Sequence, residues 1–230
     1  MSRDIYSSLS GATAAQYQMD LIAQNVANAN TNGYKELRVA FELDGNGYGP
    51  LGQVQTRESE TRSDMRSGSI RVDKDPNHLA LQGEGFFVVS ANGRELLTRA
   101  GAFQRNEEGQ LITEAGHSLM GEGGAIEVPP DEEFRVGNDG RVYGSESGEL
   151  GKIRIVDAEK VTQVGGGLWR AEGPLKEADA EVIQGALESS NVDPIRAMVE
   201  LIEASRMFEA YQKAMQASDE LDEKLNRMGD

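Results

Sequence analysis

The chain has 230 residues, with 23 basic and 39 acidic side chains, two histidines and no cysteine, and its net charge at pH 7 is -16. This charge argues against a general nucleic-acid binder, which needs a basic surface to displace counterions, and it disfavours adhesion to anionic lipid. The lack of cysteine excludes disulfides, thiolate metal sites and cysteine nucleophiles. No apolar run approaches the roughly 18 residues of a membrane span.

The first segment is predicted to be a helix from about Arg3 to Asn28. Polar residues interrupt it, so it does not resemble a cleaved secretory signal, and we expect any export to proceed without one. The strong turn pair Asn32-Gly33 ends the segment. Its apolar positions follow the three-four spacing of a helix stripe: Ile5, Leu9, Ala12, Ala15, Met19, Ile22, Val26 and Ala29.

Asparagines crowd the end of this helix, and two interpretations remain open. Asn25, Asn28 and Asn30 could cap the helix and form the turn. Alternatively, Asn25 and Asn28 could lie at a helix–helix seam and fix its register, as a buried asparagine can do at some cost in stability.

The middle of the chain is predicted to be β. Residues 35–78 form an extended linker or β segment, with a flexible loop at 45–50. Residues 79–190 form a β-rich domain in which short strands alternate with turns, as expected for an antiparallel sandwich or barrel-like domain. The apolar run Phe86–Val89 and the arm Glu95–Arg99 flank an Asn-Gly turn and predict a hairpin, and Lys152–Val156 predicts one further strand.

Residues 191–230 return to helix. Asp193 is suited to the N-cap and Pro194 to the first helical position. The apolar stripe that follows comprises Ile195, Met198, Leu201, Ile202, Ser205, Phe208, Tyr211, Met215, Leu221, Leu225 and Met228. Both terminal stripes need cover, from each other and then from neighbouring subunits. The expected fold class is therefore α+β, with antiparallel β structure in the middle and terminal helices that pair as a coiled-coil-like domain.

No residue pattern predicts catalysis, a cofactor or a metal. His78 and His117 each stand alone, and we expect turn or surface positions for both. The acidic run Asp131–Glu133 lacks the spaced oxygen ligands of a calcium loop and is expected to be a solvated turn. Trp169 is expected to be a core or interface anchor. The pattern favours a part of an assembly over an enzyme.

Four motifs, in order, resemble the rod and hook family of bacterial flagellar axial proteins. The first is Ala23–Lys35, which includes Asn-Ala-Asn-Thr-Asn-Gly-Tyr-Lys. The second is Gln82–Val89, with Gly-Glu-Gly-Phe-Phe. The third is Leu97–Phe103, with Thr-Arg-Ala-Gly-Ala-Phe, which continues into a Gly-x-Leu pattern. The fourth is Leu187–Asp193, which leads into the C-terminal helix.

The resemblance implies a structural subunit of the flagellar basal-body rod, because the middle is shorter than in hook proteins. It favours the proximal over the distal rod type, although Asn191–Pro194 is similar to the distal type. It implies an inner domain of the N-terminal helix (1–34) and the C-terminal helix (191–230), and an outer β domain (79–190). Implied partners are itself, other rod proteins and the flagellar export apparatus, with no nucleic acid and no membrane span, in the periplasmic part of the flagellum.

The assembly interface is expected on the terminal segments. Its predicted residues are Ile5, Leu9, Ala12, Met19, Ile22, Asn25, Val26, Asn28, Asn30, Gly33, Met198, Leu201, Phe208, Met215 and Leu221. The residues alone leave two other functions open. One is a carboxylate-dependent hydrolase of the cell wall, for which no pair of acids stands out, and the other is a secreted β-rich binding module.

Overall fold

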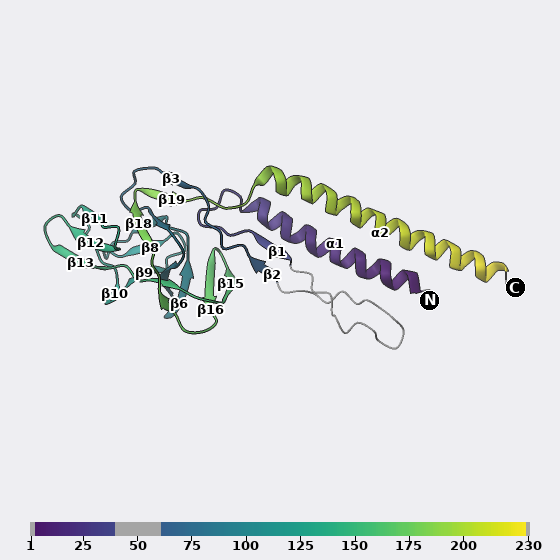
Figure 1. The fold of residues 1–230 in the computed structure, drawn as a ribbon, viewed down its shortest axis with the longest axis horizontal. Helices are drawn as coiled ribbons and strands as arrows, with labels where there is room; N and C mark the ends of the chain where they lie inside the picture. Colours follow the sequence, from purple (N-terminus) through teal and green to yellow (C-terminus); the bar gives the residue numbers. More distant parts are fainter. Residues whose placement is uncertain (1–2, 40–60, 229–230) are drawn as a thin grey trace. The chain divides into compact units, whose positions relative to one another are not determined.

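The computed structural model describes residues 3–39 and 61–228, and the side chains of 8–39, 61–218 and 220 (Figure 1). The chain forms two compact units. The helical unit comprises residues 1–29, 36–64 and 192–230, and the β unit comprises 30–35 and 65–191. The predicted loop at 45–50 lies outside the described residues. Two helices and antiparallel strands make up the described part of the chain, which confirms the α+β class.

The helical unit contains α1 (Arg3–Ala27), α2 (Pro194–Met228), and the short strands β1 (Leu37–Val39) and β2 (Thr61–Ser63). The two helices contact each other along their length (Figure 1). The Asp193 carboxylate accepts hydrogen bonds from the backbone N–H groups of Ile195 and Arg196 at 3.0 and 3.2 Å. This confirms Asp193 as the N-cap that starts α2.

The contact between the helices depends on small residues of α1. Ala12 and Ala15 are buried, and Gly11 lies directly beneath the ring of Tyr211. A Cβ added to Gly11 would come within 2.5 Å of that ring. Glycine inside a helix costs about 1 kcal/mol relative to alanine, and here it allows an aromatic ring of α2 to lie against the α1 backbone.

Asn25 of α1 holds the first strand. Its side-chain amide donates to the Leu37 carbonyl at 2.8 Å, and its side-chain oxygen accepts from the Leu37 N–H at 2.9 Å. These bonds tie α1 to β1, a role that neither sequence interpretation of Asn25 included. The Asn28 side chain donates to the carbonyl of Gln24 at 2.9 Å, in the last turn of α1.

The β unit is built from antiparallel pairs among the described strands. Its largest sheet has the order β15-β16-β6-β5-β9-β8-β7, and β14 also pairs with β5. The strands are β3 (Ile70–Val72), β4 (Leu79–Gln82), β5 (Phe86–Ala91), β6 (Arg94–Thr98), β7 (Phe103–Arg105), β8 (Leu111–Thr113), β9 (Ser118–Gly121), β10 (Gly124–Ala125), β11 (Phe134–Val136), β12 (Arg141–Gly144), β13 (Gly148–Lys152), β14 (Ile155–Asp157), β15 (Val161–Gly165), β16 (Leu168–Ala171), β17 (Lys176–Glu177), β18 (Glu181–Gln184) and β19 (Ala186–Glu188).

Strand β5 is buried on both faces, which explains its uninterrupted apolar sequence. Phe87 belongs to the main core and meets Phe103 edge-on, with ring centroids 5.5 Å apart. Phe86, on the opposite face, belongs to a second core with Trp169, again with centroids 5.5 Å apart. Trp169 is fully buried, so it is a core residue as the sequence predicted. The hairpin between β5 and β6 is confirmed.

Two predictions for the β region are wrong. Lys152–Val156 is not one strand, because the chain changes pairing partners within it. Lys152 pairs with Arg141 of β12, Ile153 forms an isolated bridge to Gly121, and β14 then pairs with β5. Glu132 is not part of a solvated turn. It is buried, and its carboxylate accepts backbone hydrogen bonds from Glu146 and Ser147 at 2.6 and 2.7 Å and a hydroxyl bond from Ser147 at 2.7 Å.

Candidate assembly interface

One face of α2 is turned toward α1. Its members are buried or half-buried, and Tyr211 among them contacts Gly11. They alternate at spacings of four and three residues: Ala197, Leu201, Ala204, Phe208, Tyr211, Met215 and Ser218. Such spacing keeps side chains on one helical stripe. This face is covered within the chain.

The opposite face of α2 carries a second apolar set that is exposed. Ile195 is 76% exposed, Met198 52% and Ile202 54%, with Val199 beside them. At about 100° of rotation per residue, these side chains point away from the α1-facing row. They occupy the first two turns of the helix. The single predicted stripe of α2 is therefore two stripes, of which the chain itself covers one.

The predicted interface residues divide according to burial. Ala12, Ile22 and Asn25 are buried, whereas Met19, Val26 and Asn28 and, on α2, Leu201, Phe208 and Met215 are half-buried. Leu9 and Met198 are exposed. The side chains of Ile5 and Leu221 lie outside those that the structure describes.

Asn30 and Gly33 belong to the β unit rather than to the helical unit. Gly33 is buried, has a φ of +68°, and donates its N–H to the Glu188 carbonyl at 2.7 Å. A Cβ at this position would come within 2.4 Å of the Arg99 backbone. Both the positive φ and this close approach require glycine. The structure thus gives Gly33 a packing role inside the β unit.

Sequence reasoning missed a buried ionic cluster in the β unit. Lys35, Arg99 and Glu188 are 1–3% exposed, and Glu188 bridges the two cations. Lys35 and Glu188 lie 153 positions apart in the sequence, so no local pattern links them. The one available signal was that a charged residue at position 188 interrupts a buried strand.

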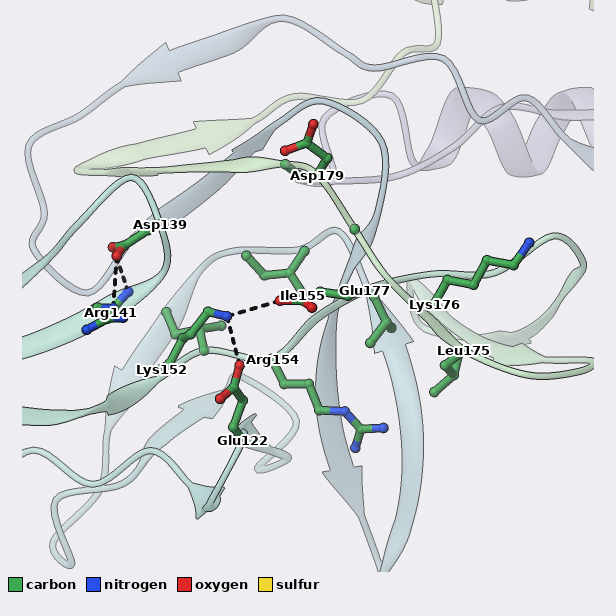
Figure 2. A pocket seen from close by; sticks show the side chains of 14 residues that line it. Glu122, Asp139, Arg141, Lys152, Arg154, Ile155, Leu175, Lys176, Glu177 and Asp179 are labelled. Carbon is green, nitrogen blue, oxygen red and sulfur yellow. Dashed lines mark hydrogen bonds and ion pairs between the residues drawn. The ribbon is translucent and has the colours of Figure 1, made fainter.

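A polar cavity of about 570 Å³ opens on the β unit (Figure 2). Lys152 is one of its lining residues and donates to Glu122 and Glu177 at 2.8 and 3.0 Å (Figure 2). These hydrogen bonds raise the pKa of Lys152, because they stabilise the charged ammonium. Asp139 likewise pairs with Arg141 at 3.0 Å. Glu122, Glu177 and Asp139 are therefore each paired with a cation, an arrangement that suits a solvated ionic surface.

Among the described residues, no group of three or more histidine, aspartate or glutamate side chains is placed to hold a metal ion. Neither helix, over the part of the chain that the structure describes, is long and apolar enough to cross a membrane. The feature that calls for a functional explanation is accordingly the uncovered apolar face of α2.

Three family descriptions match the chain in sequence. "Flagella basal body rod protein" matches residues 5–35, "Flagellar hook protein FlgE/F/G D1 domain" matches 80–144, and "Flagellar basal body rod FlgEFG protein C-terminal" matches 183–228. The first and last matches cover much of the two helices. The second includes the hairpin formed by β5 and β6.

Full-length relatives carry the same names. The flagellar basal-body rod protein FlgF of Caulobacter vibrioides is 33% identical over 96% of this chain and 95% of its own. FlgF of Salmonella typhimurium is 31% identical over 99% of this chain and 98% of its own. The flagellar basal-body rod protein FlgG of Bacillus subtilis is 29% identical, over 98% of both chains.

Proposed function

Because this chain belongs to the flagellar basal-body rod protein family, and is a structural subunit of the flagellum rather than an enzyme, we propose that it forms part of the proximal rod. The FlgF-type relatives favour this assignment over the distal, FlgG type. A protein of this kind acts by holding its neighbours in register while the rod turns, so its function resides in its contact surfaces.

Within the chain, the proposed contact is a coiled-coil-like pairing of α1 and α2. The alternation of four and three residues on the α1-facing side of α2 supports this, since it is the spacing of knobs that enter holes on a partner helix. The close fit of Tyr211 on Gly11 also supports it. The pairing leaves one side of α2 for other subunits.

Between chains, the proposed contact is the exposed set Ile195, Met198, Val199 and Ile202, hereafter the outer stripe. Its exposure is the observation that carries the proposal. An apolar set of this kind marks an interaction site when its members are contiguous. The net charge of -16 makes copies of the chain repel one another. Burial of the outer stripe in a specific contact would therefore be needed to hold copies together.

Repetition of one such contact with a rotation that does not close produces a helical filament. The proposed partners are copies of this chain and the other rod proteins. We further propose that the subunit reaches a periplasmic position through the flagellar export apparatus, which is the route that the rod assignment implies.

The experiment expresses the Met198→Asp variant in a gene deletion strain made from a motile parent. We expect loss of swimming and basal bodies whose rod stops short, with the helical content of the purified protein unchanged, because Met198 makes its contact outside the chain. Met207→Asp is the matched control. Met207 is the same residue type, is 50% exposed, and lies about 120° around the helix from the outer stripe.

Swimming at the wild-type level with Met198→Asp would remove the outer stripe from the interface. A gene deletion strain that swims normally would overturn the rod assignment itself. The control variant is expected to swim, and equal loss in both variants would show that any added charge on α2 is harmful rather than charge at this stripe.

A further inference from the structure

Glu188, the last residue of β19, is the centre of the buried ionic cluster. One oxygen of its carboxylate accepts from the Lys35 ammonium at 2.6 Å and from the Gly68 N–H at 2.9 Å. The other oxygen accepts from the Arg99 guanidinium at 3.2 Å. With an exposure of 1%, the carboxylate depends on these partners for its hydrogen bonds.

The two cations extend the network to further backbone segments. Lys35 also donates to the Arg66 carbonyl at 2.9 Å. Arg99 donates to the Gly83 carbonyl at 2.7 Å, and its guanidinium lies 5.6 Å from the centre of the Phe86 ring. The cluster is therefore continuous with the sheet that contains β5.

Three of the joined segments, at residues 35, 66–68 and 188, lie close to a point where the chain passes between its two units. The chain passes between its two units after residues 29, 35, 64 and 191. Lys35 is the last residue before one passage, the segment 66–68 follows another, and Glu188 precedes the last. Further bonds link these segments, from the Asn191 side chain to the Arg66 carbonyl at 3.0 Å and from the Ser189 N–H to the Ser69 carbonyl at 2.9 Å.

We propose that the Lys35–Glu188–Arg99 cluster is a mechanical anchor that fastens the entering and leaving segments of the β unit to its main sheet and carries torsional force from them. The proposal rests on the rod function, since a rod subunit must pass torque through its chain. The cluster ties three segments, far apart in sequence, to one carboxylate.

Ionic hydrogen bonds suit this task better than an apolar contact. Apolar burial is non-directional, so packed segments can shift along one another with little loss. A charge-assisted bond in a buried site is lost when its partners move apart by a small distance, and it leaves an uncompensated charge behind. Two cations around one anion also make Glu188 the indispensable member.

The direct test is single-molecule pulling on the purified full chain. The chain has no cysteine, so Glu36→Cys and Ile195→Cys provide unique handles just outside the β unit, and the force reaches the cluster through Lys35 and Glu188. We expect Lys35→Met to lower the force of the first β-unit rupture by roughly half, because it leaves a charge-balanced Glu188–Arg99 pair but removes the bond to segment 35.

Arg154→Met is the control. It removes an ion pair of similar length, Arg154–Glu95 at 2.7 Å, whose side chains are 34% and 50% exposed, and solvent-accessible pairs contribute little. We expect an unchanged rupture force. The same force in Lys35→Met and in the wild type would overturn the proposal. If circular dichroism shows that Lys35→Met does not fold, Arg99→Met, which keeps the Lys35–Glu188 pair, decides by the same criterion with a smaller expected fall.

Motility gives the second measurement. In cells that incorporate Lys35→Met into basal bodies, we expect normal swimming in dilute medium and a several-fold greater loss of speed than the wild type in viscous medium, where torque is high. An identical dependence on viscosity would overturn the anchor and leave the rod function standing. The gene deletion test of the rod function is separate from both measurements.

Discussion

The two units of the chain bury their apolar residues in different ways. In the β unit, large side chains such as Phe87, Leu79 and Trp169 are fully enclosed. Among the described side chains of the helical unit, the least exposed are mainly small, such as Ala12, Ala15 and Ala204. Leu21 and Ile22 are buried as well, whereas Ile195 and other large side chains face outward. One part of the chain thus completes its own core, and the other presents apolar surface that a second molecule can cover.

This difference indicates where folding and assembly take place. A domain that encloses large side chains gains enough from burial to offset its ordering entropy. Two helices in contact through small residues gain less, and helix stability in proteins comes chiefly from tertiary packing. We therefore expect the β unit to fold as a monomer and the helical unit to reach full order in the assembled rod.

Hydrogen exchange on the purified monomer should show the largest contrast. Amides of β5 should exchange only on global unfolding, whereas amides of α1 should exchange through local opening, at rates on the order of 1000-fold faster. In assembled rods the difference should shrink, because neighbours cover the helices. Strong protection of residues 5–28 in the monomer would contradict this expectation.

Phe87→Ala tests the enclosed core. Phe87 has no exposed surface and contacts Phe103 edge-on, so its removal leaves a cavity, and we expect a loss of about 3–5 kcal/mol in the free energy of unfolding of the β unit. Urea titration followed by tryptophan fluorescence measures this, since Trp169 lies in the β unit. Tyr143→Ala, at an aromatic side chain that is 40% exposed, should change the midpoint little.

The sequence was most informative where structure is local. The three-four spacing and the caps placed α1 within a residue of its observed end, and Asp193 and Pro194 marked the start of α2. Asn92-Gly93 marked the turn between β5 and β6, where both residues adopt positive φ. Periodicity, caps and turns report hydrogen bonding between near neighbours, which is why they can be read without a fold.

The candidate site was less predictable, because partners distant in sequence determine it. A helical stripe shows which side chains are apolar, but the position of α1 decides which of them are covered, so Leu201 and Met198 could not be separated beforehand. Glu188 and Lys35 gave no sign of each other across 153 positions. Glu132 was predicted to be a solvated acid. Its burial depends on Ser147, which the β12–β13 turn places beside it.

Leu201→Asp and Phe208→Asp test the covered face of α2. Both side chains are half-buried in the α1-facing row, so we expect a carboxylate there to cost roughly 1–3 kcal/mol in helix pairing and to block assembly. Far-UV circular dichroism should show reduced helix, with the unfolding of the β unit unchanged. Assembly at the wild-type level by either variant would contradict the assigned face. Met207→Asp, on an exposed flank of α2, again serves as the control.

Loss of the Ser147–Glu132 hydrogen bond should produce the smallest effect, and its size should depend on pH. The Ser147 hydroxyl and the backbone N–H groups of Ser147 and Glu146 lower the pKa of Glu132 below its usual value of 4.5. A carboxyl group whose pKa is lower in the folded state stabilises the fold above its unfolded pKa, and this contribution disappears as the pH falls through the folded pKa. Ser147→Ala removes the hydroxyl bond, which lowers the pKa of Glu132 the most. We therefore expect a slightly lower melting temperature at pH 7 and a difference from the wild type that vanishes at acidic pH. Ser145→Ala, at an exposed serine in the same turn, should melt like the wild type at both pH values. A deficit in Ser147→Ala that persists undiminished at acidic pH would show that the serine acts through packing rather than through the Glu132 carboxylate.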